Sequence, residues 1–252
     1  MQLSADGKNI FSFEDAKSFW GSSHYAKVAL HRLVRKQMLI QLERGKYLIV
    51  PFEAGPERKW TEDSFLIANA LVQPAVIAYW TAVRHWNWTE QIPRIVYVQT
   101  TARKRRPRRT VIGVPYEFVT LPNHKFFGHA SEWINGKPVL LTDKERTLLD
   151  CADDVARAGS IEELVKAVTN AAPEISWERL DEYALRFSNG AALKRLGFLL
   201  ENLDLQLPER AKEVLERWPP RLTKGIAALR PSGRRTGKIN SRWRVRVNVP
   251  FS

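Results

Sequence analysis

The first informative stretch of the chain has apolar positions that follow two helical patterns separated by a glycine. Ser12 is a good N-cap, and apolar residues recur after it at helical spacing until Gly21 interrupts the pattern. Ser22 or Ser23 can cap a second helix that runs to about Gln37. The pattern therefore predicts a short helix, a tight turn and a longer helix.

The second predicted helix has one apolar side and one basic side. The apolar side contains Ala26, Ala29, Leu30, Leu33 and Val34. Two β-prone runs then enclose the charged turn 43–46, which predicts a hairpin. This order of elements predicts a winged helix-turn-helix, in which the second helix enters the DNA major groove and the hairpin, the wing, contacts the flanking backbone.

The residues predicted to contact DNA lie on the second helix and in the hairpin turn. They are Ser22, Ser23, His24, Lys27, His31, Arg32, Arg35, Lys36, Arg44 and Lys46. A basic helix face can also be an ordinary solvated surface. The presence of caps, turn and wing in the correct order favours DNA binding.

The net charge of +13 is concentrated in two segments of the chain. The segment 103–109 (RKRRPRR) holds six basic residues, and the segment 218–252 holds nine with no acid. The rest of the chain has 25 basic against 27 acidic residues. Such a balance indicates an acidic partner, whether nucleic acid, an anionic membrane face or an acidic protein.

Beyond the hairpin, the Pro- and Gly-containing stretch 51–59 is suited to a linker. We predict a winged-helix domain over 1–58 and a larger α+β domain over 59–252. Helical patterns are expected at 62–72, 76–86, from Lys144 through Ala152, 160–169, 176–187, 191–203 and 208–218, and strands at 94–101, 111–121, 137–141, 226–229 and 242–249. Thr61 is the expected cap of the first of these helices, Thr142 and Glu145 form a capping box, and Trp80, Trp86 and Trp88 are expected in the core.

Two basic features of the larger domain are candidate contacts to phosphates or to an acidic partner. The first is the segment 103–109, expected to be a flexible loop between strands, with Arg103, Lys104, Arg105, Arg106, Arg108 and Arg109. The second belongs to the basic C-terminal strands (224–250): in the strand 242–249 the apolar residues alternate with Arg242, Arg244 and Arg246, which should form a ladder of arginines in solvent. A mobile, solubilising loop is the alternative for the first feature.

Catalytic and metal-binding patterns are sparse, and we predict no catalytic residue, metal or cofactor. Neither common phosphate-binding glycine loop is present, nor a G-x-S-x-G elbow. His124 and His129 lie in an expected loop and form no ligand set. The best candidate magnesium ligands are Asp143, Glu145, Asp150, Asp153 and Asp154, but helix-start and solvated-face roles account for them.

The compartment is expected to be the cytoplasm. Cys151 is the only cysteine, so no intrachain disulfide is possible. The N-terminus has no secretory pattern, and the most apolar window, 65–79, is too short to span a bilayer.

Several segments in order resemble the AbiEi-type antitoxins, the transcriptional-regulator half of type IV toxin–antitoxin (abortive infection) systems. They are LERGKYLI, TEQIPRIVYVQT, LTDKERTLLDCADD, ALKRLGFLLENL and INSRWRVRVN. The resemblance implies an N-terminal winged helix that reads DNA and a C-terminal antitoxin domain closed by a β-strand. It also implies repression at inverted repeats in the protein's own promoter, and neutralisation of an AbiEii-type nucleotidyltransferase toxin in phage defence.

One departure from the winged-helix pattern concerns the beginning of the chain. A full helix normally precedes the helix-turn-helix pair, but only eleven residues precede Ser12. We expect one of three arrangements: the first helix is missing, it is replaced by a strand, or it is supplied by the second domain. The functions that remain as alternatives to a repressor and antitoxin are a metal-dependent nuclease using the Asp143–Asp154 acids, and a non-specific nucleic-acid-binding adaptor.

Overall fold

The N-terminal part of the molecule is a winged helix-turn-helix in which a strand precedes the helix pair. The computed structural model describes residues 9–51, 54–55 and 60–250. Its first elements are β1 (Ile10–Ser12), α2 (Phe13–Trp20), α3 (Ser23–Arg35), β2 (Leu39–Glu43) and β3 (Lys46–Ile49). β1 pairs antiparallel with β3, which gives a sheet of order β1-β3-β2. Within the described residues, the position of the expected first helix is therefore taken by a strand.

The helix boundaries of this unit follow from its caps. The Ser12 side chain accepts from the amide of Asp15, whose carboxylate accepts from the Ser12 amide, and Gly21 ends α2 in the left-handed region. The Ser22 side chain accepts from the amide of His24 and caps α3. The helix ends at Arg35, two residues before the predicted end, because Gln37 has a φ of 55°.

The two sides of the small sheet pack differently. Phe11, Leu39 and Ile49 join a cluster with α2 and α3, whereas Leu42 and Leu48 belong to a second cluster with the central sheet and α4. The winged helix therefore shares apolar packing with the rest of the molecule.

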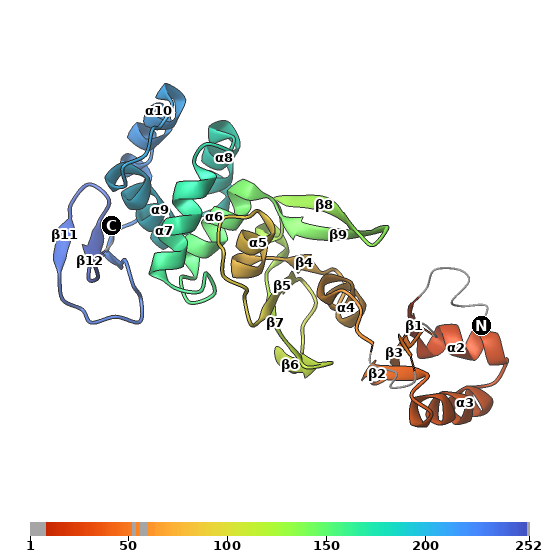
Figure 1. Ribbon diagram of the computed structural model, residues 1–252. Coiled ribbons are helices and arrows are strands. Elements are labelled where there is room, and N and C mark those ends of the chain that lie inside the picture. Colours follow the sequence, from red (N-terminus) through yellow and green to blue (C-terminus); the bar gives the residue numbers. More distant parts are fainter. Residues whose placement is uncertain (1–8, 52–53, 56–59, 251–252) are drawn as a thin grey trace.

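A six-stranded mixed sheet forms the middle of the elongated molecule (Figure 1). Its order is β6-β7-β5-β4-β9-β8, with β4 (Val76–Ile77), β5 (Val96–Thr100), β6 (Arg108–Val111), β7 (Val114–Thr120), β8 (His129–Ile134) and β9 (Lys137–Thr142). β5 is buried along its whole length, as its apolar pattern predicts. α4 (Ser64–Leu71) packs on β5 and β9.

Several sequence expectations in this region are wrong. Asp63, not Thr61, caps α4. The predicted helix 76–86 is divided into β4 and α5 (Tyr79–His85), because Val76 pairs with Gln99 on one side and Leu140 on the other. The first two residues of the predicted helix therefore pair as a strand of the sheet.

The expected loop around His124 and His129 also contains regular structure. A short helical turn, η2 (Asn123–Lys125), precedes β8, which begins at His129 and pairs antiparallel with β9. The sequence does not predict this edge strand, because its polar composition lacks the apolar alternation of a strand.

The C-terminal part is a helical bundle that packs around the largest apolar cluster. It contains α6 (Lys144–Asp153), α7 (Ile161–Ala171), α8 (Trp177–Phe187), α9 (Gly190–Asn202) and α10 (Glu209–Arg217), followed by η3 (Pro219–Arg221). Trp88 is buried and joins this cluster, with Trp80 and Trp86 packed against it, which confirms core packing for the three tryptophans. None of the helices in the described part of the chain has the length and apolar character needed to cross a membrane.

A small sheet of order β10-β12-β11 closes the bundle at the end opposite the winged helix (Figure 1). Its strands are β10 (Ala227–Ala228), β11 (Lys238–Asn240) and β12 (Val245–Val247). Trp243 is fully buried against α9, where a Cβ on Gly197 would lie 2.1 Å from its ring. The apolar side of the predicted strand 242–249 is therefore confirmed, although its regular pairing covers three residues.

Candidate nucleic-acid interface

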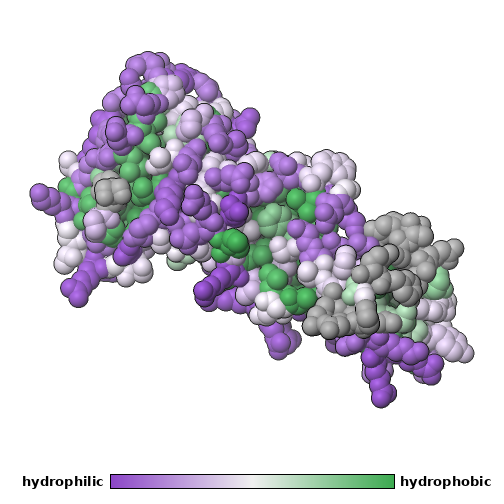
Figure 2. All heavy atoms as spheres, viewed as in Figure 1, coloured by the Kyte–Doolittle hydropathy of each residue, from purple (hydrophilic) through white to green (hydrophobic). Residues whose placement is uncertain are grey.

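The outer face of α3 is basic and solvent-exposed. His24, Lys27, His31 and Arg35 are exposed on it, whereas Ala26 and Leu30 are buried beneath. Figure 2 shows hydrophilic residues along the edge of the molecule formed by this helix. Ser23, Arg32 and Lys36 are also exposed, and the half-buried Ser22 caps the helix. Helical spacing thus brings the predicted residues of this helix onto an accessible surface.

The turn of the wing contains an exposed arginine and a paired lysine. It also contains Gly45 with a φ of 79°, and the carbonyl oxygen of Gly45 accepts a hydrogen bond from the amide of Phe13 at 2.7 Å. Arg44 is exposed and has no ionic partner among the described residues. Lys46 lies 2.9 Å from a carboxylate oxygen of Glu43. Arg44 is consequently the wing cation most available to a phosphate.

An open groove of about 510 Å³ lies between α3 and the hairpin, here called the α3–wing groove. Lys27 and His31 of α3 and Arg44 of the turn line its rim. Its floor includes Leu30 and Tyr47. Three of the ten predicted DNA-contacting residues, from the helix and the wing, therefore line one hollow.

Glu43, at the end of β2, joins the wing to the central sheet. The guanidinium group of Arg109 in β6 lies 2.5 Å from its carboxylate and also donates to the carbonyl oxygen of Leu42 at 3.0 Å. Lys104 lies 3.8 Å from the same carboxylate and donates to the carbonyl oxygen of Leu71 at 2.7 Å. Partial burial would raise the pKa of Glu43, but the hydrogen bond from Lys46 and the charges of Lys104 and Arg109 lower it below its ordinary value.

The basic segment 103–109 is therefore only partly the predicted flexible loop. Arg108 and Arg109 belong to β6, and Arg108 lies 2.8 Å from the carboxylate of Glu117. Antiparallel pairing with β7 and the bonds of Lys104 hold half of the segment in place. Arg103, Arg105 and Arg106 are exposed and have no ionic partner among the described residues.

The predicted ladder of C-terminal arginines in solvent is wrong. Arg242 lies 2.8 Å from carboxylate oxygens of both Glu201 and Glu216. Arg244 has a φ of 52° and donates to the carbonyl oxygens of Leu222 and Thr223. Arg246 is half-buried in β12. A turn replaces the first half of the predicted strand, so two of the three arginines bond inside the protein.

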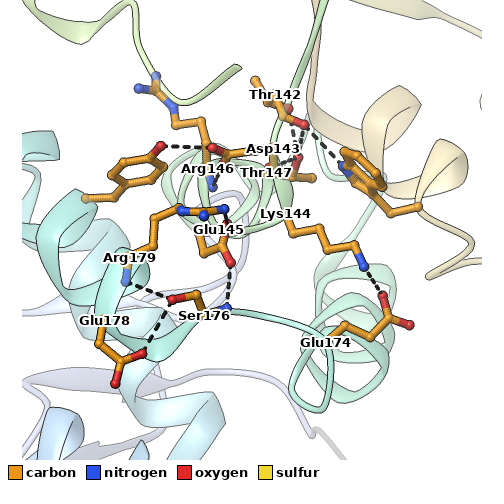
Figure 3. Close-up of polar contacts among 12 residues, drawn as sticks. Thr142, Asp143, Lys144, Glu145, Arg146, Thr147, Glu174, Ser176, Glu178 and Arg179 are labelled. Atoms are coloured by element: carbon orange, nitrogen blue, oxygen red, sulfur yellow. Dashed lines mark hydrogen bonds and ion pairs between the residues drawn. The ribbon is translucent and has the colours of Figure 1, made fainter. Parts of the chain in front are cut away.

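The acidic group around α6 is divided among separate structural roles, and Figure 3 shows those of Asp143 and Glu145. Asp143 caps α6 in place of the predicted Thr142, because Thr142 is the last residue of β9. Glu145 is buried and accepts from the amide of Ser176 at 2.6 Å. The expected reciprocal capping by Glu145 is therefore wrong.

The remaining acids of this group also have their own partners. Asp150 is buried, not on a solvated face as predicted, and pairs with Arg146 at 2.9 Å. Asp153 accepts a hydrogen bond from Asn189, and Asp154 pairs with Arg157. Within the residues that the structure describes, no group of three or more His, Cys, Asp or Glu side chains could hold a metal ion.

Glu43 and its partners are not identifiable from the sequence. The only local signal is a single acid within a basic hairpin turn, and that pattern also fits an ordinary solvated ion pair. Its partner Arg109 lies 66 residues away in the chain. Only the packing of the two sheets brings these side chains together.

Comparisons with known proteins support the assignment of the N-terminal unit. Residues 1–50 match the family described as "Transcriptional regulator, AbiEi antitoxin", which confirms the resemblance predicted from the sequence. A crystal structure of the RV2827C protein from Mycobacterium tuberculosis is similar over 97% of this chain and 88% of that chain, with a TM-score of 0.67 and 16% sequence identity. At this identity the likeness shows a shared fold alone. No curated protein matches the chain.

Proposed function

We propose that this protein is a sequence-specific DNA-binding transcriptional repressor that also serves as an antitoxin. In this proposal a winged-helix domain over 1–58 reads inverted repeats in the protein's own promoter, and the region 59–252 neutralises a cognate nucleotidyltransferase toxin of the AbiEii type. The protein acts in the cytoplasm as a non-enzymatic part of a type IV, abortive-infection system. The family match of residues 1–50 to transcriptional regulators and antitoxins supports both roles.

The observation that carries the DNA-binding role is the exposed basic face of α3 beside Arg44 of the wing. Lys27 and Arg35 are exposed and have no ionic partner among the described residues. Helices of winged-helix proteins enter the major groove with such a face, where arginine, lysine and polar side chains reach base edges. We assign base reading to α3 and backbone contact to Arg44 and Lys46.

A second part of the proposed DNA surface lies on the central sheet. Lys104 is held between Glu43 and the carbonyl oxygen of Leu71, so its chain neighbours Arg103 and Arg105 lie close to the wing. Figure 1 shows β6, which follows this segment, at the edge of the central sheet nearest β2. These exposed arginines would add sequence-independent phosphate contacts next to the site read by α3.

The decisive experiment compares binding to the operon's own promoter with binding to random duplex DNA. The variants are Lys27→Ala, His31→Ala and Arg35→Ala. A variant that loses a hydrogen bond to a base should bind the promoter more weakly by about 1–3 kcal/mol and should show a smaller preference for the promoter over random DNA. Glu14→Ala on α2 serves as a matched surface control, because Glu14 is exposed and pairs only with Lys17 among the described residues. Unchanged promoter affinity in all three variants would overturn the assignment of α3 as the reader.

The antitoxin role is tested separately. If a nucleotidyltransferase is encoded beside this gene, co-expression should restore growth in cells that produce that toxin. Loss of rescue on deleting 59–252, with rescue kept in the α3 variants, would assign the antitoxin role to the larger region. Failure of the whole chain to rescue growth would remove the antitoxin role and leave a DNA-binding regulator.

A further inference from the structure

The α3–wing groove has an apolar floor that a DNA backbone would not require. The half-buried side chains of Phe13, Val34 and Tyr47 line it beside the buried Leu30, and all four belong to the apolar cluster of the winged helix. Phosphates are strongly hydrated anions and gain nothing from an apolar floor. This composition is instead typical of a small-molecule site, in which an apolar lining buries the ligand body and a few polar groups orient it.

The rim of the groove is cationic, and none of the described residues supplies a counter-ion to it. Lys27 and Arg44 have no ionic partner among the described residues. The nearby acid Glu43 is already engaged by Lys46 and Arg109. A negatively charged ligand can therefore pair with Lys27 and Arg44 without displacing an acid of the protein.

The size of the groove restricts the ligand further. Its volume of about 510 Å³ lies within the roughly 300–1,000 Å³ range of small-molecule sites. We propose that the α3–wing groove binds a small amphipathic anion, with an aromatic or aliphatic body on the apolar floor and a carboxylate or sulfonate at Lys27, His31 and Arg44.

This site would regulate DNA binding, an inference that rests on the proposed function. The same three side chains are proposed to contact DNA, so an anion bound to them and a DNA duplex exclude each other. By linkage, bound DNA must weaken binding of the anion by the same factor as the bound anion weakens binding of DNA. A metabolite of this chemical class would therefore release the repressor from its promoter.

The binding site is tested with full-length protein and 1-anilinonaphthalene-8-sulfonate as the probe, followed by fluorescence and calorimetry. We expect one probe molecule per chain, at least tenfold weaker binding in the Lys27→Ala/Arg44→Ala double variant, and loss of binding in Gln41→Trp. Gln41 lines the groove from the exposed side of β2, so a larger side chain fills the hollow without entering the core. The double variant Arg103→Ala/Arg105→Ala has the same charge change elsewhere and should keep the parental probe affinity.

Two controls make the result decisive. The uncharged analogue N-phenyl-1-naphthylamine should bind at least tenfold more weakly than the sulfonate, and circular dichroism should show that the variants are folded. Absence of probe binding, or binding that folded variants of the groove leave unchanged, would overturn the proposed site.

Competition with DNA separates this inference from the proposed function. Displacement of the probe by promoter duplex, with a reciprocal loss of DNA affinity, supports both the site and its regulation. A probe that binds through Lys27 and Arg44 to a protein that fails to bind DNA leaves the site standing and overturns the repressor. Independent binding of probe and duplex to the same protein would overturn the regulation.

Discussion

Arg109 of β6 and Glu43 of β2 form an ion pair at 2.5 Å, although 66 residues separate them in the chain. Arg109 donates a further hydrogen bond to the carbonyl oxygen of Leu42. Side chains from the same strands, Leu42 and Val111, share one apolar cluster beneath this pair. The wing and the central sheet are therefore joined by side-chain contacts as well as by the chain that connects them.

The first prediction concerns the sign of the effect of Glu43→Gln on DNA affinity. Removal of a negative charge beside phosphates would by itself strengthen binding. We expect the substitution instead to weaken promoter binding about tenfold, or about 1.4 kcal/mol, because Glu43 positions the wing relative to the 103–106 arginines. Fluorescence anisotropy measures the affinity of parent and variant for promoter and random duplexes. Glu14→Gln, which removes an exposed acid of α2, is the charge control, and a gain in affinity for Glu43→Gln would contradict the positioning role.

The second prediction concerns the salt dependence of DNA binding. Replacement of Arg103, Arg105 and Arg106 by alanine should reduce the slope of log K against log salt by about one for each phosphate that the protein no longer neutralises. The decrease should be similar for promoter and random DNA. The Arg242→Ala/Arg244→Ala variant should keep the parental slope, since both side chains bond within the protein. A slope that changes only in the C-terminal variant would place the DNA backbone at the opposite end of the molecule.

The third prediction concerns a buried ion pair on α6. Arg146 and Asp150 are almost fully buried, and the side chain of Gln99 donates to Asp150 at 2.7 Å. Arg146→Met should lower the free energy of unfolding by about 3–5 kcal/mol, because it leaves a buried carboxylate without its charge partner. Urea denaturation measures this decrease. Arg210→Met removes two exposed ion pairs, with Glu178 and Glu213, and should leave stability nearly unchanged. Equal effects of the two substitutions would contradict the argument.

The fourth prediction concerns pH and His129. Burial, together with the positive charges of Arg146 and Arg186, lowers the pKa of this imidazole to about 4 from the ordinary 6.5. The unfolded chain therefore binds a proton more readily than the folded protein between these values, so the contribution of His129 to stability is complete above pH 6.5 and is lost as the pH falls toward 4. The unfolding midpoint in urea should fall less between about pH 7.5 and about pH 5 in His129→Asn than in the parent. An identical decrease in both proteins would assign the acid sensitivity to other groups.

The winged helix is the part that could be predicted most fully, because its signals are local. The capping by Ser12 and Ser22 and the break at Gly21 depend on residues within one turn of each other. The basic face of α3 follows from helical periodicity alone. The predicted strand 94–101 and the core tryptophans are confirmed for a similar reason, since apolar composition over a short window indicates burial.

The errors concern residues whose environment comes from distant segments. Val76 and Ile77 have a helical pattern, yet β5 and β9 draw them into a sheet. Asp150 has the spacing of a solvated helix face, yet it is buried and Gln99 of the central sheet bonds to it. Arg242 and Arg244 alternate with apolar residues as in a strand. In the folded protein, however, Arg242 pairs with acids of α9 and α10, and Arg244 donates to the carbonyl groups of 222–223.

The helix-turn-helix, its wing and the side chains that α3 exposes follow from the amino-acid sequence, because caps, turns and periodicity act within a few residues. The choice of which basic residues remain available to a partner is made in the folded molecule. Arg109 and Arg242 carry the same charge as Arg44 and Arg105, but the first two find carboxylates in space and the others, among the described residues, do not. Pairing between charges depends on distances across the folded chain, and these distances are set by packing.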